Sequence, residues 1–330
     1  GNAGTGSLTV QSGGTVDNQD GLVGSAAGGS GTATVDGASS SWTNNGDLVV
    51  GAEGSGTLNV QAGGAVSSTG LLYVGDDGSG TLNIQTGGTV TSASGSLGVG
   101  NGSSGAATVD GAGSTWTSGG LTVGGLGTGT LSIQNGGSVV SGSSRLGSGA
   151  SGDGTVTVNG AGSSWTTGSS LVVGDSGTGF LDILNGGSVT STEGYLGRDV
   201  GGNGTAIVNG AGSTWDSTGD LWVGDRGTGT LSVQSGAVVT TTNNFRVGEN
   251  GTGILNIQNG GMVTSNSGFV GNDLGGSGTV TVNGGGSSWT ISNDLGVGSS
   301  GAGTLNIQNG GVVSNLGGYL GAWTDGNGTA

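Results

Sequence analysis

The side chains in this sequence that could do chemistry are mostly carboxylates and hydroxyls. The 330 residues include no His and no Cys, which excludes Ser-His-Asp and Cys-His nucleophiles and most zinc sites. Paired carboxylates can cleave glycosidic bonds, and Asp76 and Asp77 are adjacent, but they lie in a Gly-rich turn. Asp199 and Asp225 each adjoin an arginine, and the chain has only four basic residues from which to build a substrate groove. We predict no catalytic residues and no enzyme activity.

Acidic residues also recur at Gly-rich turns, where stacked turns could bring several oxygens around one calcium ion. These residues are Glu53, Asp76, Asp77, Asp175, Asp225 and Glu249. The sequence lacks the GGxGxDxUx nonapeptide of calcium-binding β-rolls. We therefore predict no metal site and no cofactor-binding residues, and we keep calcium as an alternative.

The elements that would position these residues come from a repeat. The stretch GTLNIQNGG at 303–311 returns as GTLNIQTGG at 80–88 and GILNIQNGG at 253–261, and weaker copies begin every 24 or 25 residues. Leu305 and Ile307 alternate with polar residues, which predicts a strand with one apolar side. Asn309, Gly310 and Gly311 then predict a sharp turn.

We expect about 13 coils of 24–25 residues, each with three short strands, stacked as a parallel β-helix. One strand cannot bury its apolar side alone, but stacked coils share a core. The 87 Gly suit corners that need positive φ, and the absence of Pro suits unbroken backbone ladders. No linker interrupts the period, so residues 1–330 are predicted to form a single continuous solenoid, a section of a longer repeat array.

Two kinds of coil alternate irregularly. One kind has Leu at the third position of the repeat, and the other has Ala or Val there and a Trp nine residues later. The tryptophans of the second kind are Trp42, Trp116, Trp165, Trp215 and Trp289. We interpret them as core residues whose indoles fill the space that the missing Leu leaves. Val200 and Leu274, in longer final turns, are expected to tuck under the neighbouring coil.

Apolar residues at outward positions predict a contact surface. Phe180 and Leu184 face outward on one strand and Ile207 on the next, and Trp222 falls outward on a third strand. These four are the candidate lateral contact. The first and last coils lack a polar cap, so coil ends are a second route to self-association. Outward Thr, Asn and Gln columns predict coil-to-coil hydrogen bonds, with binding of surface glycans as an alternative.

The net charge limits the kinds of molecule that this chain is expected to bind. A formal net charge of −16 argues against nucleic acid and against anionic membrane surfaces, which select basic patches. No stretch approaches 18 consecutive apolar residues, so no membrane-spanning segment is predicted.

The units GTLNIQNGG and GAGSSWTTGSSLVVGDSGTG (residues 160–179) resemble the repeat of bacterial type V secretion (autotransporter) passengers and PEP-CTERM-associated surface proteins. The resemblance covers essentially the whole chain. It implies a right-handed parallel β-helix exported to the cell surface, without catalytic residues. The expected function is a non-enzymatic extracellular structural or adhesive rod. Alternatives are a subunit of an extracellular filament or biofilm matrix fibre and, more remotely, a polysaccharide-acting enzyme.

Overall fold

The computed structural model describes residues 1, 3–323 and 325–330. Every regular element in this part of the chain is a strand, and all strand pairs are parallel, so the predicted parallel β-solenoid of about 13 turns is confirmed. We number the coils by their first Gly. Coils 1 to 14 begin at Gly6, Gly31, Gly56, Gly80, Gly105, Gly129, Gly154, Gly179, Gly204, Gly229, Gly253, Gly278, Gly303 and Gly328.

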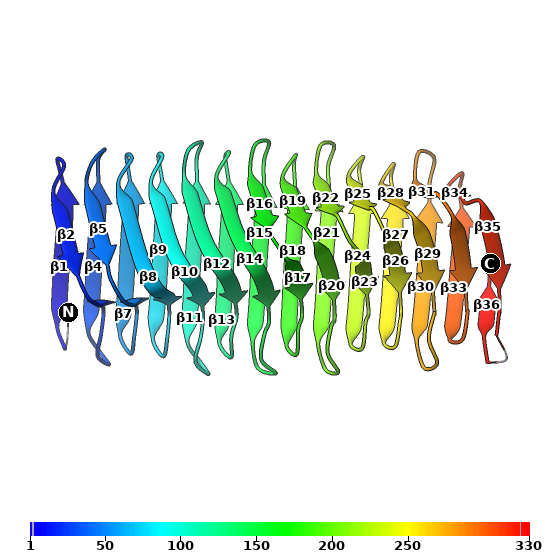
Figure 1. Ribbon diagram of the computed structural model, residues 1–330, viewed down its shortest axis with the longest axis horizontal. Coiled ribbons are helices and arrows are strands. Elements are labelled where there is room, and N and C mark those ends of the chain that lie inside the picture. The colour runs from blue at the N-terminus through cyan, green and yellow to red at the C-terminus, as the bar shows by residue number, and fades with distance from the viewer. Residues whose placement is uncertain (2, 324) are drawn as a thin grey trace. The chain divides into compact units, whose positions relative to one another are not determined.

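The chain divides into two compact units, residues 1–168 and 169–330, described separately below. In the first unit the strands that open each coil pair in chain order and form the first row (Figure 1). They are β1 (Thr5–Gln11), β4 (Ser30–Asp36), β7 (Ser55–Gln61), β9 (Ser79–Gln85), β11 (Ser104–Asp110), β13 (Thr128–Gln134) and β15 (Asp153–Asn159).

The remaining strands of the first unit form a second and a third row. They are β2 (Thr15–Asn18), β3 (Gly21–Val23), β5 (Ser41–Asn44), β6 (Leu48–Val50), β8 (Ala65–Val74), β10 (Thr89–Leu97), β12 (Thr115–Val123), β14 (Ser138–Leu146) and β16 (Ser164–Thr167). The three rows are present in each coil, but in β8, β10, β12 and β14 the second-row and third-row strands join into one continuous strand. Between β8 and β10 the register shifts at this corner, between Ser92 and Ser94.

The second unit keeps three separate rows. The first row is β18 (Thr178–Leu184), β21 (Asn203–Asn209), β24 (Thr228–Gln234), β27 (Thr252–Gln258), β30 (Ser277–Asn283), β33 (Ala302–Gln308) and β36 (Asn327–Thr329). The second is β19 (Ser188–Ser191), β22 (Thr214–Ser217), β25 (Val238–Thr241), β28 (Met262–Ser265), β31 (Ser288–Ile291) and β34 (Val312–Ser314). The third is β17 (Ser170–Val173), β20 (Glu193–Leu196), β23 (Leu221–Val223), β26 (Asn244–Val247), β29 (Ser267–Val270), β32 (Asp294–Val297) and β35 (Gly317–Leu320).

The alternation read from the repeat sets which side chains are inside. In coil 4, Leu82 and Ile84 are fully buried, and outward Asn83 donates to the Asn59 side chain at 2.9 Å. Gln85 likewise donates to Gln61 at 3.0 Å. The predicted coil-to-coil ladders of polar side chains are therefore present on the first row.

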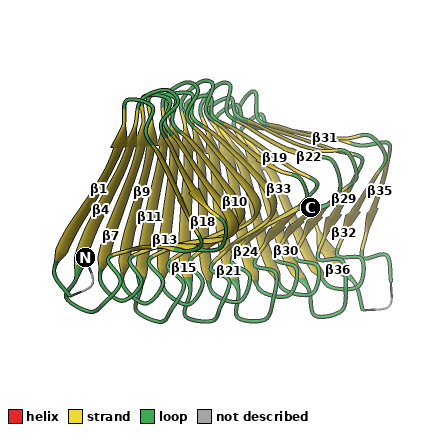
Figure 2. Cartoon of the chain, turned by 60° about the vertical axis from the view of Figure 1, so that its left-hand side comes forward, coloured by secondary structure: helices red, strands yellow, loops and turns green. Residues whose placement is uncertain are grey.

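Glycine has two structural uses in the repeat. At the corner after the first strand, where Figure 2 draws green turns between yellow strands, Asn309 and Gly310 have φ of 53° and 83°, as a left-handed turn requires. The Gly that opens each coil is different, because it points inward in a strand. A Cβ on Gly80 would lie 2.2 Å from the carbonyl oxygen of Val50, so only Gly fits this close backbone approach.

Candidate interaction surfaces

The five predicted core tryptophans lie inside, with Trp42 4% exposed and the other four fully buried. A buried indole N–H needs an acceptor, and each donates to a polar side chain of the preceding coil. The pairs are Trp42 with Asn18 (2.6 Å), Trp116 with Ser92 (3.4 Å), Trp165 with Ser141 (3.0 Å), Trp215 with Ser191 (3.1 Å) and Trp289 with Ser265 (3.1 Å). These tryptophans are core residues, and Trp42 also lines a cavity at the first coil.

Val200 and Leu274 do not tuck under a neighbouring coil. They are 81% and 73% exposed, because their Gly-rich turns project away from the strands. Each turn closes on itself through a backbone bond, Gly202 to Asp199 at 2.8 Å and Gly276 to Asp273 at 2.9 Å. The expectation is wrong because the turn satisfies its own backbone and leaves its tip in solvent.

The candidate lateral contact splits into two places. Phe180 and Leu184 lie on β18, and Ile207 lies on β21 in register with Asp182, which sits between them in the sequence. Phe180 is 40% exposed, and burial raises the pKa of Asp182. These three side chains face outward on the first row of the second unit, with Asp182 among them. Trp222 lies on the third row instead.

Trp222 is part of a ladder of outward side chains that the sequence reading missed. Its ring stacks on Tyr195 with centroids 4.4 Å apart and an interplanar angle of 1°. Arg198 lies over the Tyr195 ring at 5.4 Å, and Arg246 lies over the Phe269 ring at 5.2 Å. Tyr195, Trp222, Arg246 and Phe269 are successive partners in strand register. The sequence does contain a signal for this ladder, because aromatic and Arg residues recur at one position of the repeat.

Carboxylates flank this ladder and pair with its arginines. Arg246 contacts Glu249 at 2.7 Å and Asp220 at 3.4 Å. Tyr195 donates to Glu193 at 3.0 Å, and burial is the first of the causes that raise its pKa to about 12. Because its ring faces and charges meet one another, the ladder is a poor platform for stacking a sugar ring or for binding a polyanion.

The acidic turn residues differ in their surroundings. Arg226 pairs with Asp199 at 2.7 Å on the surface. In coil 3, burial raises the pKa of Asp76, with a smaller contribution from the neighbouring Asp77. In the second unit, burial raises the pKa of Asp225 and of Glu249, while nearby Arg side chains oppose the shift. Across the described residues, no group of three or more acidic side chains is placed to hold a metal ion.

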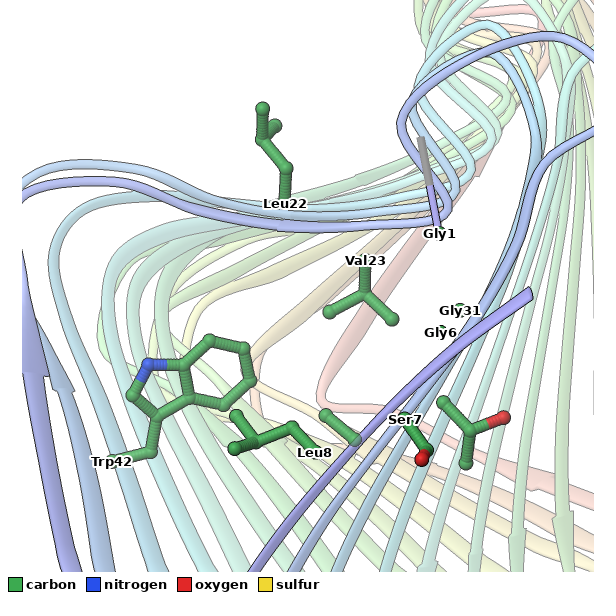
Figure 3. Close-up of a pocket in the computed structure, with 10 residues that line it drawn as sticks. Gly1, Gly6, Ser7, Leu8, Leu22, Val23, Gly31 and Trp42 are labelled. Carbon is green, nitrogen blue, oxygen red and sulfur yellow. The ribbon is translucent and has the colours of Figure 1, made fainter. Parts of the chain in front are cut away.

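An apolar cavity of about 250 Å³ opens at the first coil of the first unit. Figure 3 shows Leu8, Val23 and Trp42 turned toward one another around it, and Leu22 pointing away. Ser7, Thr32, Ala33 and three glycines complete the lining, so its only side-chain oxygens are two hydroxyls. The cavity is therefore mainly apolar, with a polar margin at Ser7 and Thr32.

No described segment forms a helix long and apolar enough to cross a membrane. No protein-family model matches the sequence, and no curated protein matches it. Among solved structures, a hyper-glycosylated TibA fragment, residues 55–350, glycosylated by TibC, is similar at 18% identity, over 95% of this chain and 100% of that one. The TM-score is 0.28, and a likeness of this strength carries no conclusion about fold or function.

Proposed function

We propose that this chain is a non-enzymatic structural module of a bacterial cell surface, built to present an extended solenoid face outside the cell. The observation that carries the proposal is where the indole and guanidinium side chains lie and what they contact. The five core indoles are buried, and Arg198, Arg226 and Arg246 contact carboxylates or rings of the same unit. These indole and guanidinium groups make contacts within the solenoid, which supports a structural role.

The sequence resemblance to autotransporter passengers and PEP-CTERM-associated surface proteins supports the extracellular location. The charge also fits, because a net charge of −16 keeps neighbouring molecules apart and soluble. Adhesion is the expected use of the module, with surface glycans as the possible targets. The candidate binding surfaces are the polar ladder of the first row and the apolar patch of Phe180, Leu184 and Ile207.

The test uses intact cells of the source organism and an antibody raised against the purified chain. We expect labelling of unpermeabilised cells and loss of the label after brief protease treatment of the cell surface. Labelling that requires permeabilisation would contradict the proposal. Adhesion is compared between the source organism and a matched deletion strain. Turnover of acidic polysaccharides by the purified chain would support an enzyme instead.

The lateral contact is tested separately. Replacing Phe180 and Leu184 by Ser removes the apolar patch, and Val200→Ser is a matched control, because Val200 is more exposed but lies on a turn outside the patch. If the patch mediates self-association, sedimentation velocity should show a shift to smaller species for the double variant alone. An unchanged profile would remove this role.

A further inference from the structure

Each buried indole needs space that its own coil does not provide. A Cβ on Gly95 would lie 2.5 Å from Cζ2 of Trp116, one on Gly194 would lie 2.9 Å from Cζ2 of Trp215, and one on Gly268 would lie 2.6 Å from Cζ2 of Trp289. Each of these glycines belongs to the coil that precedes the tryptophan. The indole therefore occupies the place of a side chain that the preceding coil omits.

This relation holds along the whole repeat. The inward residue at this third-row position is small in each coil that precedes a tryptophan coil: Gly21, Gly95, Ser144, Gly194 and Gly268. It is large in each coil that precedes a leucine coil: Leu48, Leu72, Leu121, Leu171, Leu221, Phe245 and Leu295. Coils therefore have two kinds of face. A face with a small third-row residue is followed by a tryptophan coil, and a face with a large one is followed by a leucine coil.

The indole N–H adds a second requirement. Its acceptor lies two residues after the second-row Val of the preceding coil, as in Val189 and Ser191 or in Val263 and Ser265. In coil 1 the acceptor is Asn18, whose Oδ1 accepts from Trp42 at 2.6 Å. A face that receives tryptophan therefore combines a small third-row residue with a polar second-row acceptor.

Coil 13 has both features on the face turned away from coil 12. Gly318 follows Gly268 and Leu295 in the third-row register. A Cβ there would meet only the Asn315 side chain at 3.1 Å and a carbonyl at 3.9 Å. Asn315 stands two residues after Val313, as Asn18 stands after Val16. Leu320 beside this space is 56% exposed.

We propose that this face of coil 13 is specific for a tryptophan-bearing parallel coil as its neighbour. The five internal junctions show the occupant: its indole fills the space over Gly318 and donates to the Asn315 side chain. The first coil of a second copy does not fit, because it carries Val16 where coil 2 carries Trp42. A Val over Gly318 would leave a cavity, which costs stability.

The test extends the full chain, whose last residues Gly328, Thr329 and Ala330 match Gly31, Thr32 and Ala33 of coil 2. One extension appends a copy of residues 34–54, which completes a tryptophan coil. The other carries Ala330→Leu and appends a copy of residues 59–78, which completes a leucine coil. Each is made with Gly318 and with Gly318→Leu, and hydrogen exchange of the appended amides is followed by mass spectrometry.

On Gly318, we expect the tryptophan coil to exchange at least about tenfold more slowly than the leucine coil. Gly318→Leu should reverse this order, and protection of the leucine coil on that variant also shows that coil 13 still folds. Equal protection of both extensions, or an unprotected tryptophan coil on Gly318, would overturn the proposal. So would end-to-end oligomers of the unextended chain that Gly318→Leu abolishes, since the face would then accept coil 1 of a second copy.

Discussion

Trp215 shows how much of the stability of a coil rests on one residue. Its ring is fully buried over Gly194, and its N–H donates to Ser191 at 3.1 Å. Trp215→Ala should lower the free energy of unfolding by about 3–5 kcal/mol, the usual loss for a buried aromatic. The measurement is urea denaturation followed by circular dichroism. Trp222→Ala is the control: its ring is half-buried and stacks on Tyr195, which predicts a loss of only about 0.5–1.5 kcal/mol. Equal losses would mean that the indole is not the core element described here.

Gly80 isolates the close backbone approach at the start of each coil. A Cβ there would lie 2.2 Å from the Val50 carbonyl oxygen and from the Gly75 nitrogen. Backbone atoms cannot move aside as a flexible side chain does, so Gly80→Ala should destabilise the chain by at least about 1–3 kcal/mol. Gly285→Ala is the matched control, because a Cβ at Gly285 meets nothing within 4 Å. Thermal unfolding of both variants compares them, and a neutral Gly80→Ala would contradict the packing argument.

At the scale of the element, the sequence predicted rows better than corners. Alternation in GTLNIQNGG places Leu305 and Ile307 on one side of the strand and Thr304 and Asn306 on the other. Parallel pairing in register repeats this pattern from coil to coil. The merged strands β8, β10, β12 and β14 were not predictable in the same way, because the second corner has no left-handed residue to mark it. Local sequence specifies a turn only where the backbone leaves the extended region.

The candidate site was harder to predict for a similar reason. Phe180, Leu184 and Ile207 share a face because they share one row and one register. Trp222 was predicted to face outward on a third strand, and it lies in the third row beside Tyr195. Pairing between coils also explains why the sequence predicted only part of the space around each tryptophan. The Ala or Val that accompanies each tryptophan lies in the same coil and was recognised. The glycine under the indole, such as Gly194 or Gly268, lies one coil earlier and was not.

The third row of the second unit should respond to pH. Burial raises the pKa of Glu249, and Arg246 acts in the opposite direction. The folded chain therefore holds this proton more tightly than the unfolded chain does. Its contribution to stability is complete below the ordinary Glu pKa, about 4.3, and is lost as pH rises through the raised folded-state value. We expect the free energy of unfolding to increase as pH falls from 7 to 5.

Glu249→Gln tests the origin of that slope, because a neutral side chain of the same shape cannot titrate. Denaturation at pH 7 and pH 5 should show a smaller difference for this variant than for the wild type. Glu53→Gln, at an exposed turn of coil 2, is the control that removes a carboxylate from the surface. A wild-type chain that loses stability between pH 7 and pH 5 would contradict the assigned direction.

At the scale of the whole molecule, the two kinds of coil face determine which coils can be neighbours, and deletion of single coils tests this within the first unit. Removing residues 56–79 joins coil 2 to coil 4 and leaves Leu48 beneath Val90, a pairing of the kind found at every leucine coil. Removing residues 80–104 joins coil 3 to coil 5 and places Leu72 beneath Trp116, where only Gly or Ser occurs now.

Both deletions shorten the repeat by one coil, so they should lose similar amounts of nearest-neighbour stabilisation. The second adds the overpacking of Leu72 against an indole, which typically costs about 1–3 kcal/mol. We expect the first deletion to unfold near the wild-type temperature and the second clearly below it in calorimetry. Adding Leu72→Gly to the second deletion should recover most of the difference. If both deletions behave alike, or if Leu72→Gly fails to rescue, then coils stack by general apolar contact and not by matched faces.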